Sequence, residues 1–405
     1  MLIQKDFYKW ARLGLINLVV VAFLGVLLRY KIAFSFPIVD QKHLLHGHSH
    51  FAFSGWISQI LMTYMVWIIS DHQQKNKFQE YRYLLGSNAL VAYLMLFAFS
   101  YQGYGNVSIP LSVLSIIISY IFTLKIWNDL RPHNLQLAGS YFRTALIFNF
   151  ISTLGTFWLA YLTAKGVANQ KLYLTAVYFY LHFQYNGWFI FSSFGILTYL
   201  LHLNKVELRG DKKIFIIFSY TLIPCFLLSM LWSKLPIWIY VLVVVAALLQ
   251  LVAWIWMLVS LKIHFKNDSF RMSHERILFY IPAIALSIKF ILQALSTIPM
   301  LSTFAFGYRP VVIGYLHLIM LGIVTLFILI SLKSQGILAS NNLSKWGMFI
   351  FLIGFILNEV LLMFQALSFI DLIYISFSNE FLFAAAVIML VGLIVYYLSF
   401  NKQVN

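Results

Sequence analysis

The chain has few charged residues and a single cysteine. Asp, Glu, Lys and Arg make up 10% of its 405 residues and 62% are hydrophobic, whereas soluble domains carry about 25% charged residues. This composition predicts a polytopic membrane protein. The one cysteine, Cys225, lies in an apolar run, which excludes an intramolecular disulfide and a cysteine-cluster metal site. No small-residue cleavage site follows the first apolar run, so we expect no cleavable signal.

Acidic residues are especially scarce. The chain has 12 acidic and 28 basic residues, a formal net charge of +16. A nucleic-acid-binding protein would gather its basic residues in one patch, but here they are dispersed among the loops. We therefore predict no nucleic-acid partner, and we interpret the basic residues as markers of membrane topology.

Twelve apolar runs are each close to the ~20 residues that cross a membrane. They cover residues 13–28, 49–70, 82–101, 108–126, 141–163, 173–201, 214–232, 237–261, 277–298, 311–332, 345–366 and 380–400. No long polar stretch separates them, which predicts one all-α membrane domain over residues 1–405. Pro224 and Pro282 lie inside runs, where each is expected to kink its helix.

Lysine and arginine divide unequally between alternate loops. The two termini and the loops after even-numbered spans hold 20 of them, against 7 in the other loops. Because basic residues accumulate on the cytoplasmic side, both termini are predicted to be cytoplasmic. We expect a multi-pass protein of the cell inner membrane.

Three short segments of the chain are alike. In each, a histidine is followed five residues later by glycine: His50 and Gly55, His182 and Gly187, His317 and Gly322. The histidines are 132 and 135 residues apart, a spacing typical of an internal repeat. They fall on the second, sixth and tenth spans, in the outer half of the bilayer, at depths that agree within roughly 8 Å. This pattern predicts a pseudo-threefold bundle of four-helix units with histidines facing inward.

Histidines inside a span are candidate functional residues. Imidazole binds metal ions and haem iron, but a neutral histidine can also simply hydrogen-bond to a neighbouring helix. Gly55 and Gly322 would admit a planar ring, or equally allow close helix packing. His46 and His48 precede the second span and are further candidate ligands. His46 shares a helical face with His50, whereas His48 points roughly the opposite way.

The architecture and the motifs resemble subunit I of the haem–copper oxidase superfamily, which includes cbb3-type oxidases and nitric oxide reductases. The run Phe-Ala-Phe-Ser-Gly after His50 is similar to the run after the span-2 haem ligand of cbb3-type subunits. The resemblance implies that His50 and His317 hold a low-spin haem and that His182 matches the copper ligand of span 6. The His-Gly-His run that begins at His46 also resembles NnrS-type proteins, twelve-span relatives linked to nitric oxide stress.

Two departures from that family limit the implied chemistry. The position of the high-spin haem ligand holds Tyr315, and residues 214–232 contain none of the family's paired histidines. At most the low-spin haem site is therefore complete, which argues against oxygen reduction. No CxxCH motif is present, so any haem is bound non-covalently.

Two further ionisable residues lie deep within spans. Lys289 on the ninth span and Glu359 on the eleventh lie at comparable depth. A buried charge is tolerated mainly when it is paired. We predict a Lys289–Glu359 pair, with a structural role favoured over a proton relay or a contact to a haem propionate.

The leading hypothesis is a haem-binding membrane protein of this superfamily. It would hold haem b, with copper at His182, His46 or His48 as an option, and would act in electron transfer or nitric oxide chemistry with a redox partner protein. If it is an enzyme, it is an oxidoreductase of the oxidase or nitric oxide reductase type. The alternatives are a proton-coupled secondary transporter, or a haem-free protein whose three repeated histidines bind one metal ion.

Overall fold

The computed structural model describes residues 2–233, 235–266, 276–302, 308–370 and 376–400. Within these ranges the regular structure is helical, and only an isolated bridge between Leu338 and Phe400 pairs extended backbone. The helices are long and apolar, as expected of an all-α multi-pass membrane protein. This agrees with the class predicted from composition.

The chain forms two compact units. Unit 1 contains residues 1–128 and 328–405, and unit 2 contains residues 129–327. Both ends of the chain belong to unit 1. The continuity of the two units as one membrane domain stays a prediction.

Unit 1 is built from helices of the two ends of the chain. Its elements are α1 (Leu2–Phe34), α2 (Gln41–His50), η1 (Phe51–Ser58), α3 (Gln59–Gln73), α4 (Phe78–Gln102), α5 (Ser108–Ile126), α15 (Asn342–Ile370) and α16 (Ser378–Leu398). Segments α2, η1 and α3 follow one another without a loop. Helix α14 (Leu326–Ser334) begins in unit 2 and continues into unit 1.

Unit 2 is built from the central part of the chain. Its elements are α6 (Pro132–Ala164), α7 (Gln170–His182), η2 (Phe183–Phe189), α8 (Ile190–Leu203), α9 (Asp211–Cys225), η3 (Phe226–Met230), α10 (Ile237–Lys266), α11 (Arg276–Leu295), α13 (Arg309–His317) and η4 (Leu318–Thr325). Here too, α7, η2 and α8 form one unbroken helical segment, as do α13 and η4.

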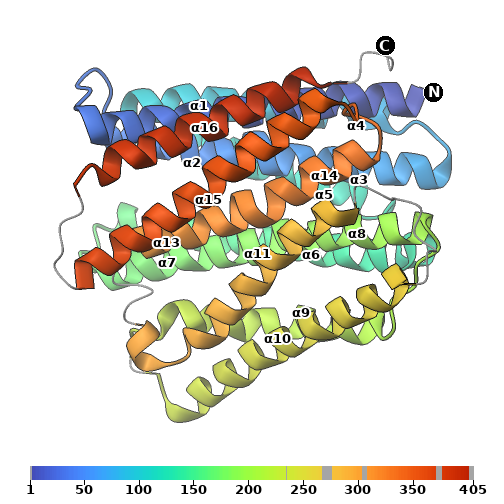
Figure 1. Cartoon of the computed structure of the whole chain (residues 1–405). Coiled ribbons are helices and arrows are strands. Elements are labelled where there is room, and N and C mark those ends of the chain that lie inside the picture. The colour runs from blue at the N-terminus through green and yellow to red at the C-terminus, as the bar shows by residue number, and fades with distance from the viewer. Residues whose placement is uncertain (1, 234, 267–275, 303–307, 371–375, 401–405) are drawn as a thin grey trace. The chain divides into compact units, whose positions relative to one another are not determined.

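Helices α15 and α16 pack against each other along their length in unit 1 (Figure 1). Glycines line their contact. A Cβ atom on Gly354 of α15 would lie 2.7 Å from the backbone nitrogen of Met389, and one on Gly392 of α16 would lie 2.7 Å from the Cα of Phe351. Small residues allow this close approach, which replaces hydrophobic driving force as the source of helix association in lipid.

Eleven helical segments of the described residues are long and apolar enough to cross a membrane. Each overlaps a run predicted from the sequence, and the first two extend well beyond it. The remaining predicted span, residues 173–201, is helical throughout its length. It is less apolar than the others because His182, Gln184 and Asn186 interrupt it.

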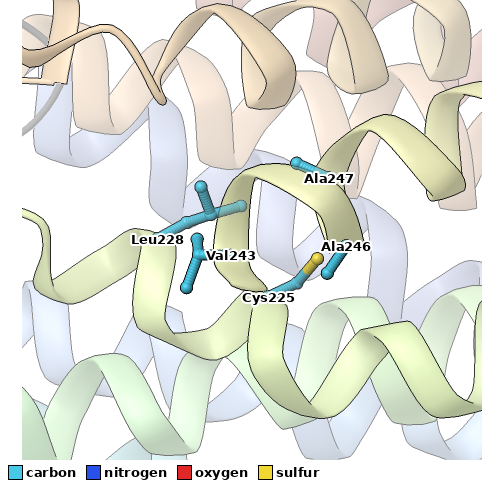
Figure 2. Packing of buried hydrophobic residues seen from close by; sticks show 5 residues of the cluster. All are labelled: Cys225, Leu228, Val243, Ala246 and Ala247. Carbon is cyan, nitrogen blue, oxygen red and sulfur yellow. The ribbon is translucent and has the colours of Figure 1, made fainter. Parts of the chain in front are cut away.

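The prolines inside spans act differently from each other. Pro224 is followed at once by a change from α-helix to the 3₁₀-helix η3, as expected where a proline removes a backbone donor. Pro282 instead lies within α11, which continues through it. On either side of this change, Cys225 and Leu228 pack against Val243, Ala246 and Ala247 of α10 (Figure 2).

Candidate functional site: histidines at the start of π-helical segments

Each repeated histidine is the last residue of an α-helix before it becomes a π-helix. The π-helical segments η1, η2 and η4 begin directly after His50, His182 and His317. π-Helix accounts for well under 1% of residues in proteins and occurs frequently at functional sites. The repeat detected in the sequence is therefore also a repeat of backbone conformation.

Buried amides hydrogen-bond to the backbone of η1. Asn88 Nδ2 donates to the Ser54 carbonyl at 3.1 Å, and Asn17 Nδ2 donates to the Gly55 carbonyl. The Tyr93 hydroxyl donates to Asn17 Oδ1 at 2.7 Å and so orients it. Such partners are needed because a π turn displaces carbonyls from the regular helical ladder. None of these residues belongs to a sequence motif, and the one signal they offer in the sequence is an asparagine within an apolar helix.

The motif glycines are closely packed within their own units. A Cβ on Gly55 would lie 2.7 Å from the Phe51 ring, and a Cβ on Gly187 would lie 2.5 Å from the Cβ of Phe148 in α6. Gly322 is buried in η4. Close packing against another helix is thus a reason for glycine at position 187, and the approach of a planar ring to Gly55 and Gly322 stays a prediction.

Histidines on one face of α2 meet the end of α4 and the loop that follows it. The His50 ring stacks on Phe99 with 4.1 Å between ring centroids, and its Nε2 lies 3.2 Å from the Tyr104 hydroxyl. The His46 ring meets the Tyr104 ring at 4.7 Å. The Tyr104 hydroxyl is protonated at neutral pH, as tyrosine ordinarily is, and can donate to His50.

His48 faces the other way, toward α1. It hydrogen-bonds to the backbone of Val21, and its ring lies against Gly25. The helical spacing therefore predicted correctly which histidines of α2 share a face.

Two imidazole nitrogens of α2 are buried without a hydrogen-bond partner among the described residues. They are Nε2 of His46 and Nδ1 of His48. A buried polar atom without a partner normally costs free energy, and each exception in a folded protein needs a reason. An unpaired imidazole lone pair is also a potential metal ligand.

Asp40 caps the N-terminus of α2 and gives the helix a pH dependence. Its carboxylate accepts a hydrogen bond from the His43 amide at 2.8 Å, and this bond lowers the Asp40 pKa below its ordinary value. The stabilisation is therefore present above the unfolded-state pKa of about 3.9 and is lost as the pH falls through the lower folded-state pKa. We expect acidification to lower the melting temperature of the wild type more than that of Asp40→Asn, because asparagine caps without titrating. Parallel melting curves for the two proteins would contradict this prediction.

His182 is buried and both its ring nitrogens are engaged within unit 2. Its Nε2 donates to the Leu222 carbonyl at 2.9 Å, and its Nδ1 accepts from Asn186 Nδ2 at 3.2 Å. The Leu222 carbonyl is available because the Phe226 amide bonds to Ile223, three residues back, where α9 changes to η3. His182 thus donates a hydrogen bond to a carbonyl that has no helical partner because the helix type changes there. A metal ion bound to either ring nitrogen would have to displace one of the two hydrogen bonds.

Tyr315 lies close to a second tyrosine of unit 2, Tyr185. Tyr315 precedes the end of α13 at His317, and its ring centroid lies 6.2 Å from that of Tyr185 in η2. Residues of the second and third motifs therefore lie together. His317 is half-buried and is the last residue of its helix before η4 begins.

The two deep ionisable residues each have a partner in their own unit. Lys289 Nζ donates to Gln293 Oε1 at 2.6 Å on the same helix, α11. Glu359 Oε1 accepts from Asn358 Nδ2 at 3.0 Å, and the carboxylate also interacts electrostatically with Arg29 of α1. The Lys289–Glu359 pair stays a prediction.

No group of three or more histidine, cysteine, aspartate or glutamate side chains in the described part of the chain is arranged to hold a metal ion. Comparison with known proteins adds no assignment, since no family model and no curated protein matches the chain.

Proposed function

We propose that this multi-pass membrane protein binds haem b non-covalently through His50 and His317, and that it acts in electron transfer or in nitric oxide chemistry with a redox partner protein. The observation that carries the proposal is the shared backbone of the motifs, in which each histidine immediately precedes a π-helical segment. π-Helical turns are rare and frequently mark functional sites. The proposal includes twelve spans in a pseudo-threefold bundle, cytoplasmic termini and location in the cell inner membrane.

The residues around His50 suit an iron-binding imidazole. The one polar neighbour of its Nε2 among the described residues is the Tyr104 hydroxyl at 3.2 Å, which is longer than the usual distance for such a bond. A hydroxyl can rotate away and leave the nitrogen lone pair for a ligand. The stacked Phe99 ring fixes the plane of the imidazole, and a ligand held in one orientation binds at lower entropic cost.

A bound haem would supply one-electron redox chemistry. The protein's own residues would orient the imidazole through Phe99 and offer the Tyr104 hydroxyl as a neighbouring hydrogen-bond donor. Buried Asn17 and Asn88 would keep η1 in its π-helical form beneath the ligand. Such supporting hydrogen bonds are a large part of how a site holds its cofactor.

Copper at His182 is not part of the proposal. Both nitrogens of this ring already have hydrogen-bond partners, and Leu222 offers only an acceptor, which requires the proton on Nε2. A haem-free site made of the three repeated histidines is disfavoured for the same reason.

An optical spectrum of the purified protein, oxidised and then reduced with dithionite, tests the proposal. We expect the sharp reduced bands of a b-type haem with two histidine ligands. His50→Ala and His317→Ala are each expected to abolish these bands. His72→Ala is the matched control, because this histidine is exposed and lies on α3, which continues the helix of His50.

His46→Ala and His48→Ala identify the ligand of the second span. Both variants are expected to keep the spectrum if His50 is the ligand. Loss of the bands in either variant, together with their retention in His50→Ala, would move the ligand to that residue. A colourless wild type after expression with ample haem would overturn the proposal.

A further inference from the structure

Lys289 places its amino group in the apolar part of unit 2. Its side chain is 2% exposed, within α11. The carboxylates of residues 129–327 are Asp129, Glu207, Asp211, Asp268 and Glu275. The first three lie in turns, in loops or at a helix start, and the last two lie outside the described residues. No carboxylate of unit 2 therefore lies inside a described membrane-spanning helix beyond its first residue.

The groups that surround Lys289 are neutral. Its Nζ donates to Gln293 Oε1 at 2.6 Å and lies 4.2 Å from the centroid of the Phe290 ring. Gln293 in turn donates to Gln250 Oε1 at 2.7 Å and lies 3.7 Å from Cys225 Sγ. These contacts hold the lysine in place without neutralising it.

Two more groups from other helices face the same ammonium. Cys225 of α9 and His182 of α7 both interact with it electrostatically. The nitrogens of His182 are already bonded, so this ring cannot accept a proton from Lys289. An ammonium group has three N–H donors, and only one hydrogen bond to a described residue uses them.

A buried cation surrounded only by neutral groups is strongly destabilising. A neutral amide and one aromatic face recover part of the lost hydration, but they leave the net charge in place. A bound anion would supply the remaining compensation, and loss of the ammonium proton is the alternative. One positive charge and spare N–H donors match a small anion of single charge.

We propose that Lys289, together with Gln250, Gln293 and Cys225, forms a buried site for a small monovalent anion of the chloride class. The anion accepts hydrogen bonds from the spare N–H donors of Lys289. The site is separate from the proposed haem site because none of its residues is a proposed haem ligand. The alternative partner for the charge of Lys289 is the Glu359 carboxylate, as in the pair predicted from the sequence.

Thermal unfolding in chloride and in gluconate, at constant ionic strength and in detergent, tests this site. The melting temperature of the wild type is expected to rise saturably with chloride, because a ligand that binds only the folded state stabilises it by mass action. Lys289→Gln is expected to weaken the apparent chloride affinity by at least about tenfold. Lys212→Gln, an exposed lysine of the same unit, is expected to keep the wild-type response.

The wild-type titration decides the question even if Lys289→Gln fails to fold. A wild type without saturable chloride dependence overturns the proposal. A chloride response that survives in Lys289→Gln also overturns it, since the anion would then bind elsewhere. The haem spectrum is measured independently of the chloride titration. Failure of the anion-site proposal therefore does not contradict the haem proposal, and failure of the haem proposal does not contradict the anion site.

Discussion

Gly392→Ala is expected to destabilise the protein by about 3 kcal/mol, at the upper end of the 1–3 kcal/mol usual for overpacking a close-packed contact. The added Cβ would lie 2.7 Å from the Cα of Phe351. Backbone cannot move aside as a flexible side chain can, so α15 and α16 would have to separate. The melting temperature in detergent is the measurement.

Gly86→Ala is the matched control for this prediction. A Cβ there would meet only the Trp10 ring at 3.9 Å, which is ordinary contact. Because alanine is the better helix former by about 1 kcal/mol, this change should be neutral or stabilising. Equal stability of Gly392→Ala and the wild type would show that α15 and α16 do not pack this closely.

His182→Phe is expected to destabilise the protein by about 2 kcal/mol. It removes two buried hydrogen bonds and leaves the Leu222 carbonyl and the Asn186 amide without their partners. Such a group typically costs about 1–3 kcal/mol, although pairs within membranes average nearer 0.6 kcal/mol. Phenylalanine keeps a ring of similar shape, so the loss reports hydrogen bonding more than volume.

The distinguishing measurement is the effect of metal removal. If His182 is a hydrogen-bonding residue, a chelator should leave the melting temperature of the wild type unchanged. His202→Phe, an exposed position on α8, should also leave it unchanged. A wild type that loses as much stability on chelation as His182→Phe does would instead identify His182 as a metal ligand.

The sequence by itself determined the membrane class, the positions of the helices and the three motifs. Long apolar runs must be helical in lipid because every backbone group has to be satisfied within the segment. Helical periodicity also placed His46 and His50 on one face of α2 and His48 on the other. These features depend only on residues near one another along the chain.

The tertiary structure decided which hydrogen-bond partners those histidines and their helical segments have. His182 is held by a carbonyl 40 residues away, and the η1 backbone is held by Asn17, 38 residues before Gly55. Neither bond is visible in a local pattern, because each joins helices whose neighbours are set by packing. The same holds for the π-helical segments, since the regular α-helix is the default for an apolar run and only partners from other helices stabilise the displaced carbonyls.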